Sequence, residues 1–129
     1  MATTFYPLND KSAVTASEYL EKAMEHLVKL TKTQYGWVTH GVKYARVMAL
    51  LGKPTALVED EYKKAISVCV EDKYLIKARE QLGCYYLARN SCKQARSQFE
   101  MAVEISGKRY YLGHVAKRGL ELVGRLLQH

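Results

Sequence analysis

The residue types that most often carry catalysis or bind metal ions are few and scattered in this sequence. Three cysteines, Cys69, Cys84 and Cys92, form neither a CxxC pair nor a cysteine–histidine cluster with zinc spacing. We therefore expect reduced and mostly packed thiols, with no metal or cofactor. The histidines form neither an HExxH motif nor a pair at i and i+4: His26, His40, His114 and His129.

The carboxylates give no stronger sign of an active site. Asp60 and Glu61 are adjacent in sequence, as are Glu71 and Asp72. Neighbouring residues point in different directions on a helix, which suits solvation rather than a shared proton. No serine or cysteine lies in a nucleophile motif, and no phosphate-binding glycine loop is present. We expect a protein that is not an enzyme.

The charge balance favours an acidic partner. Twenty lysine and arginine residues outnumber thirteen aspartate and glutamate residues, so the formal net charge is +7. Such a charge attracts a nucleic acid, an acidic protein surface or a lipid headgroup without choosing among them. No apolar run has the length of a membrane-spanning helix, and the first ten residues do not resemble a secretory signal. A soluble cytoplasmic protein is the resulting expectation.

The elements that must position these residues are predicted to be helices. Apolar residues recur at three- and four-residue spacing, which indicates an all-α chain of about six antiparallel helices. One domain is expected over residues 1–129, with residues 1–13 loose. The expected helices cover residues 15–30, 37–51, 55–71, 72–89, 91–106 and 109–127.

Several residues predict where these helices begin and end. Capping boxes are expected at Thr15, in T-A-S-E, and at Ser91, in S-C-K-Q, and Asp72 is expected to cap a third helix. Gly52, Asn90 and Gly107 should end helices, because glycine and asparagine tolerate positive φ. The last predicted helix contains three glycines, which should kink it or let it approach a neighbour closely: Gly113, Gly119 and Gly124.

The size pattern of one stretch resembles the tetratricopeptide repeat, a family of helical hairpins. Six positions match that pattern in one ungapped register: Leu82, Gly83, Tyr86, Ala95, Phe99 and Ala102. A degenerate copy precedes it, with Ala45, Met48, Gly52, Val58, Tyr62 and Ala65. We expect a degenerate repeat over residues 38–75, the clearest repeat over 76–109 and a capping helix over 110–129. Gly107 and Arg79 depart from the family, which often has proline and tryptophan there.

The resemblance implies a short right-handed superhelix whose groove binds a peptide or an amphipathic helix of another protein. Transferred by register, the groove positions are Thr39, Val42, Lys43, Arg46, Ala49, Lys77, Glu80, Gln81, Cys84 and Ala88. Of these, the predicted partner-binding residues are Thr39, Val42, Lys43, Arg46, Lys77, Gln81 and Cys84. We further expect Lys43, Arg46 and Lys77 to share one concave, positive face that suits an acidic segment.

The resemblance suggests an adaptor or chaperone, and three further hypotheses about function stay open. The first is a chaperone of a bacterial type III secretion subunit, because short chaperones of that kind are similar in size and repeat number. A basic nucleic-acid-binding helical protein is the alternative, because cationic and aromatic residues concentrate near the C-terminus: Lys108, Arg109, Tyr110, Tyr111, Lys117, Arg118 and Arg125. A homo-oligomer that uses the last helix and Tyr110 or Tyr111 is the third.

Overall fold

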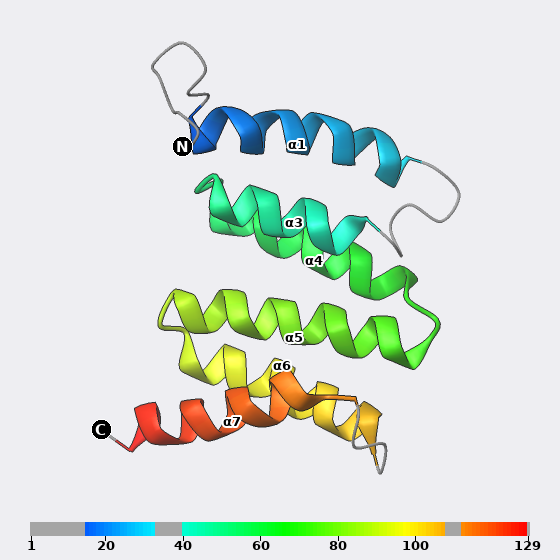
Figure 1. Cartoon of the computed structure of the whole chain (residues 1–129). Coiled ribbons are helices and arrows are strands. Elements are labelled where there is room, and N and C mark those ends of the chain that lie inside the picture. Colours follow the sequence, from blue (N-terminus) through cyan, green and yellow to red (C-terminus); the bar gives the residue numbers. More distant parts are fainter. Residues whose placement is uncertain (1–14, 33–39, 108–111, 129) are drawn as a thin grey trace, which may run out of the picture.

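The computed structural model describes residues 15–32, 40–107 and 112–128, and all regular structure in these ranges is helical. Consecutive helices run in opposite directions (Figure 1). This confirms the predicted all-α class. The six helices of these ranges are α1 (Ala16–Thr31), α3 (Gly41–Leu50), α4 (Thr55–Val68), α5 (Asp72–Ala88), α6 (Cys92–Ser106) and α7 (His114–Leu127).

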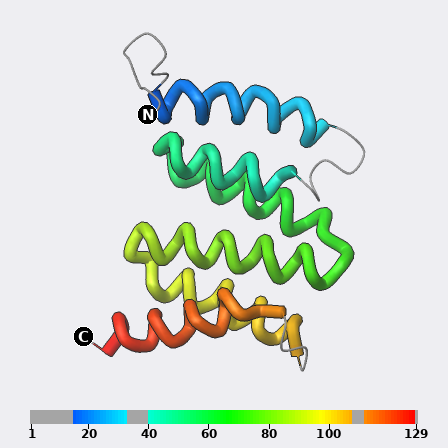
Figure 2. The backbone as a smooth tube through the Cα atoms, in the orientation of Figure 1, coloured from blue at the N-terminus to red at the C-terminus, as the bar shows by residue number. Residues whose placement is uncertain are grey.

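Three of these helices form a layer in which α5 lies between α3 and α7. All three run in the same direction, as Figure 2 shows along the tube. The antiparallel helices α4 and α6 pack against this layer, α4 on α3 and α6 on both α5 and α7. Helix α1 packs on α3. We call the three helices the α3–α5–α7 layer.

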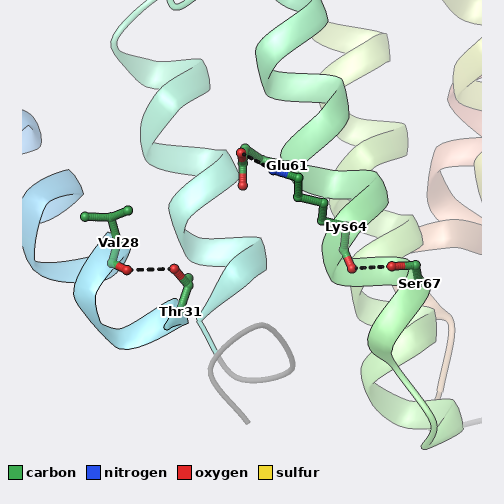
Figure 3. Close-up of polar contacts among 5 residues, drawn as sticks. All are labelled: Val28, Thr31, Glu61, Lys64 and Ser67. Carbon is green, nitrogen blue, oxygen red and sulfur yellow. Dashed lines mark hydrogen bonds and ion pairs between the residues drawn. The ribbon is translucent and has the colours of Figure 1, made fainter. Parts of the chain in front are cut away.

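Local side-chain contacts close α1 at both ends. The predicted capping box is confirmed: the Glu18 N–H donates to Thr15 Oγ1 over 3.1 Å, and the Thr15 N–H donates to Glu18 Oε1 over 3.3 Å. At the other end Thr31 is buried, and its hydroxyl donates to the Val28 carbonyl over 2.8 Å (Figure 3). A buried hydroxyl is therefore satisfied within its own helix.

Helix α4 has similar local contacts on its surface. Ser67 Oγ donates to the Lys64 carbonyl over 2.8 Å, and Lys64 Nζ lies 3.4 Å from Glu61 Oε1 (Figure 3). A second ion pair, 3.3 Å between Lys53 Nζ and Glu21 Oε1, joins the α3–α4 turn to α1. Partly exposed pairs of this kind contribute little to stability, so packing must hold the helices together.

Several predicted helix boundaries are wrong. Ser91 is the N-cap of α6 but makes no side-chain capping bond, so the second capping box does not form. Asp72 is the first residue of α5, whose N-cap is Glu71. Helix α4 ends at Val68, earlier than expected, because Cys69 is already extended with ψ of 125°.

The boundaries of the last helix and of the second one also differ. Gly113 is the N-cap of α7, not an interior residue, and its φ of 76° places it in the left-handed region. Gly52 and Asn90 have the expected positive φ of 71° and 61° after α3 and α5. His40 is the N-cap of α3, and residues 37–39 of the predicted helix lie outside the described residues.

The core contains the residues whose sizes suggested a repeat. Phe99 is fully buried, and its ring lies between two glycines from different helices. A Cβ atom added to Gly83 of α5 would lie 2.6 Å from Phe99 Cε1, and one added to Gly119 of α7 would lie 2.5 Å from Cε2. The two glycines thus allow α5 and α7 to approach α6 closely. The other buried repeat positions are Ala45, Met48, Val58, Tyr62, Ala65, Leu82, Tyr86, Ala95 and Ala102.

Within the described residues, no helix combines the length and the apolar composition needed to span a bilayer.

Candidate functional site

The solvent-facing side of α5 forms the middle of the α3–α5–α7 layer. Residues spaced four, four, three and four apart share this side of the helix: Lys73, Lys77, Gln81, Cys84 and Ala88. All are exposed except Gln81, which is half-buried. The opposite side of α5 contributes Leu82 and Tyr86 to the core. This α5 stripe is therefore available to a partner.

A surface cavity of about 480 Å³ lies between α3 and α5. We call it the α3–α5 cavity. It opens to solvent, and Leu50 in its lining is 62% exposed. Helix α4 contributes one wall residue, Tyr62. Five predicted groove positions line this cavity: Arg46, Ala49, Gln81, Cys84 and Ala88. Leu50, Tyr85 and Arg89 complete the lining.

Two tyrosines give the α3–α5 cavity an aromatic wall. The ring centroids of Tyr62 and Tyr85 are 6.1 Å apart. Burial raises the pKa of Tyr62 to about 12, so its hydroxyl stays protonated at neutral pH. Tyr85 is 9% exposed, and its buried hydroxyl has no hydrogen-bond partner among the described residues. An unsatisfied hydroxyl of this kind is unusual in a protein interior.

Two arginines make the α3–α5 cavity positive. Arg46 lies on α3, and Arg89 follows the last residue of α5. The Arg89 guanidinium lies over the Tyr85 ring, with its central carbon 5.7 Å from the ring centroid. Both arginines are exposed, and neither forms an ion pair with a described residue. Their charges are therefore free to act on a partner.

Cys84 lies in the α3–α5 cavity as an exposed free thiol, whereas Cys69 and Cys92 are partly buried and also free. Desolvation raises the pKa of the Cys84 thiol, with a further increase from Glu80 and an opposing effect of Arg46. A thiol with a raised pKa is mostly protonated at neutral pH, which makes it a poor nucleophile. Cys84 is therefore better suited to contact a partner than to react.

A second cavity, also about 480 Å³, lies between α5 and the start of α7. We call it the α5–α7 cavity. Lys77 lines this cavity, so the structure separates it from Arg46, which lines the other one. The remaining lining residues are Lys73, Tyr74, Ile76, Glu80, Leu112, Gly113, His114 and Val115.

Glu80 was predicted to be a groove position, and this prediction is wrong. Its side chain is not available to a partner, because the residue is 8% exposed. Its carboxylate oxygen Oε2 instead accepts a hydrogen bond from the backbone N–H of Ala116, over 2.8 Å. The carboxylate thus caps α7, whose own N-cap residue has no side chain.

The other predicted positions lie on or near α3. Lys43 is exposed and precedes Arg46 by one helical turn, so the two basic side chains share a side of α3. Val42 and Ala49 are half-buried and pack partly against the core. Thr39 lies outside the described residues, as do Lys108, Arg109, Tyr110 and Tyr111 of the nucleic-acid hypothesis.

Helix α7 adds an exposed apolar stripe that the predicted groove positions do not include. Val115, Leu122 and Leu126 are 48%, 42% and 48% exposed and share one side of the helix, because they are spaced seven and four residues apart. Val115 also lines the α5–α7 cavity. This α7 stripe therefore meets the α5 stripe at its Val115 end. The spacing of these three residues is visible in the sequence, but the sequence alone does not show which side of α7 is buried.

Chemistry that needs clustered ligands has no site in the described ranges. No group of three or more histidine, cysteine, aspartate or glutamate residues there could hold a metal ion. The arrangement that the structure does provide is an exposed helical layer with two cavities, a positive region at α3 and an apolar stripe at α7. This surface presents hydrogen-bonding, charged and apolar groups to the solvent.

The chain matches no known protein family, no curated protein sequence and no solved structure. The resemblance to the tetratricopeptide repeat therefore depends on this chain's own residues.

Proposed function

We propose that this protein binds a segment of another protein across the exposed side of the α3–α5–α7 layer, as an adaptor or a chaperone. The observation that carries the proposal is the α3–α5 cavity. Residues from three helices build it, and two unpaired guanidinium groups lie beside aliphatic and aromatic side chains. A concave site with mostly apolar walls and a few polar groups is typical of ligand recognition.

The neighbouring surfaces support a partner longer than a single side chain. The α5 stripe continues from the α3–α5 cavity to Lys77 at the α5–α7 cavity, which Val115 of the α7 stripe also lines. An amphipathic helix or an extended strand has the matching combination of charged and apolar side chains. In a right-handed tetratricopeptide-like superhelix, the first helices of successive hairpins would form this groove.

The same surface favours a protein partner over a nucleic acid. Base stacking needs accessible aromatic faces, but Tyr62 and Tyr85 are buried in the wall of the α3–α5 cavity. The exposed apolar residues Leu50, Leu122 and Leu126 would stay uncovered on a phosphate backbone. An acidic protein segment would cover them and also neutralise the arginines.

The test is to select random peptides displayed on phage against the whole chain and to repeat the binding with a filled cavity. Cys84→Trp places a large side chain in the α3–α5 cavity, whereas Ser97→Trp adds the same ring to the exposed surface of α6. We expect selected peptides to lose at least about tenfold in affinity with Cys84→Trp and to bind Ser97→Trp normally. Circular dichroism would verify that both variants are folded.

Two results would overturn the proposal. One is a selection whose enriched peptides bind both tryptophan variants equally, because the α3–α5 cavity would then be irrelevant. The other is tight binding of labelled RNA or DNA with a steep dependence on salt concentration, which is the signature of phosphate contacts. That result would favour the basic nucleic-acid-binding protein.

A further inference from the structure

We infer that the α3–α5 cavity takes a specific pair of groups from its partner, an aliphatic side chain and a carboxylate next to it. This inference rests on the proposed function and adds the chemistry of the ligand. The whole-chain charge of +7 favours acidic partners in general. The cavity lining narrows that preference to one place and one arrangement.

The aliphatic half of the pair is inferred from the walls. Ala49 and Leu50 of α3 line the same cavity as Ala88 of α5, and the Tyr85 ring adds an aromatic surface. Leu50 is 62% exposed, so much of its side chain stays in water until a partner covers it. Burial of apolar surface from both partners is the main source of affinity in such a contact. A leucine, isoleucine or methionine of the partner has suitable chemistry.

The carboxylate half is inferred from Arg46 and Arg89. Arg46 lies on α3 and Arg89 directly follows α5, and both line the same cavity. Neither forms an ion pair with a described residue. A guanidinium group presents its N–H donors in a planar fork that matches the two oxygens of a carboxylate. The Tyr85 ring beneath Arg89 supports that side chain through a cation–π contact. A bound carboxylate would therefore have cationic donors on two sides.

One neutral group strengthens this assignment. The Gln81 amide lines the α3–α5 cavity and can donate to a carboxylate oxygen. A partner that covers the apolar walls would displace water from the α3–α5 cavity, which would increase the strength of each ionic hydrogen bond.

The experiment reverses the charge of the two arginines in the α3–α5 cavity and leaves the apolar wall residues unchanged. Peptides are selected by phage display against the wild-type chain and, separately, against the Arg46→Glu/Arg89→Glu variant. The matched control is Lys63→Glu/Arg96→Glu, which makes the same change in net charge at exposed positions of α4 and α6. Cys84→Trp reports in parallel whether each peptide occupies the α3–α5 cavity.

We expect wild-type peptides to share an aliphatic residue beside aspartate or glutamate, and to bind the Arg46→Glu/Arg89→Glu variant at least about tenfold more weakly. That variant should select lysine or arginine beside the same aliphatic residue. The Lys63→Glu/Arg96→Glu control should bind the wild-type peptides within about twofold. Arg46→Gln/Arg89→Gln removes the charge without reversing it, and should give an intermediate loss.

The experiment distinguishes a failure of the carboxylate inference from a failure of the proposed function. If Cys84→Trp abolishes binding but the arginine variants bind the same peptides as well as wild type, the carboxylate inference is overturned and the proposed function stands. If acidic residues are absent from the cavity-dependent peptides, the inference is overturned in the same way. If no peptide depends on Cys84, the proposed function fails and the inference fails with it.

Discussion

Glu80 on α5 accepts a hydrogen bond from the backbone N–H of Ala116 on α7, with 2.8 Å between Oε2 and the nitrogen. Ala116 is the third residue of α7, where a helix has N–H groups without partners in the helix itself. A carboxylate at this end also interacts favourably with the helix dipole. Glu80 therefore fastens the last helix to the middle of the α3–α5–α7 layer.

Replacement of Glu80 by alanine should loosen α7. We expect the free energy of unfolding to fall by about 1–3 kcal/mol, because a buried N–H group loses its partner. Urea denaturation would measure the loss, and amide hydrogen exchange would locate it in α7. The matched control is Glu100→Ala at an exposed position of α6. Amides of α7 that exchange as slowly as in the wild type would contradict the capping role.

Two glycines of α7 should respond in opposite ways to alanine. A Cβ at Gly119 would meet Phe99 Cε2 at 2.5 Å, whereas a Cβ at Gly124 meets nothing within 4 Å. Alanine at Gly119 should therefore destabilise the protein by about 1–3 kcal/mol through overpacking. Alanine at Gly124 should stabilise it by up to about 1 kcal/mol, because alanine is the better helix former. Thermal unfolding of both variants tests the contrast.

The Phe99 ring should account for the Gly119 effect. Phe99→Ala alone should cost about 3–5 kcal/mol, as expected for a fully buried phenylalanine. In that background Gly119→Ala should lose most of its cost, because the added methyl group then has space. Urea denaturation of the two single variants and the double variant gives the coupling energy. Additive effects would show that Phe99 is not the obstacle.

Alkaline pH should destabilise the fold through its buried tyrosines. Burial raises the pKa of Tyr62 from 10.0 to about 12, so the folded state favours the protonated hydroxyl. The pKa of Tyr86 is raised too, first by burial and then by its hydrogen bond to Glu59. The unfolded chain loses these protons first, so stability is complete below pH 10 and is lost as the pH rises towards 12.

The size of the Tyr62 contribution can be measured with Tyr62→Phe. The shift corresponds to about 2–3 kcal/mol of stability lost between the two pKa values. We expect the phenylalanine variant to lose that much less than wild type over the same pH interval in urea denaturation. Parallel stability curves for the two proteins would show that Tyr62 does not titrate as proposed.

The sequence predicted features that depend on residues close together in the chain. The capping box of Thr15 and Glu18 needs only one turn of helix, and it forms as expected. The alternation of small and large residues around Gly83 and Phe99 likewise indicated which side chains are buried. Helix type and much of the core therefore followed from local spacing and side-chain size.

Features that depend on neighbouring helices could not be predicted in this way. Ser91 has the sequence of a capping box, but its side chain makes no capping bond. Glu80 has the sequence position of a groove residue, yet α7 covers it and uses its carboxylate. Both differences concern polar side chains, whose contacts depend on the directions in which other helices approach.

The basic residues should differ in how strongly they accelerate association with an acidic partner. Arg46 lines the α3–α5 cavity and Lys43 lies one turn away, whereas Lys77 lines the α5–α7 cavity. Lys43→Glu/Arg46→Glu should therefore slow binding of a cavity-dependent peptide by about tenfold or more at low salt, and Lys77→Glu should slow it less. Stability should barely change, because all three side chains are exposed.

Stopped-flow measurements at several salt concentrations would test this order. Salt screens long-range attraction, so the association rates of wild type and both variants should converge as salt increases. Lys63→Glu/Arg96→Glu, with charges reversed on α4 and α6, provides the control for net charge. If that control slows association as much as Lys43→Glu/Arg46→Glu, the total charge attracts the partner and the position of Arg46 has no special role. If Lys77→Glu has the larger effect, the acidic part of the partner binds at the α5–α7 cavity instead.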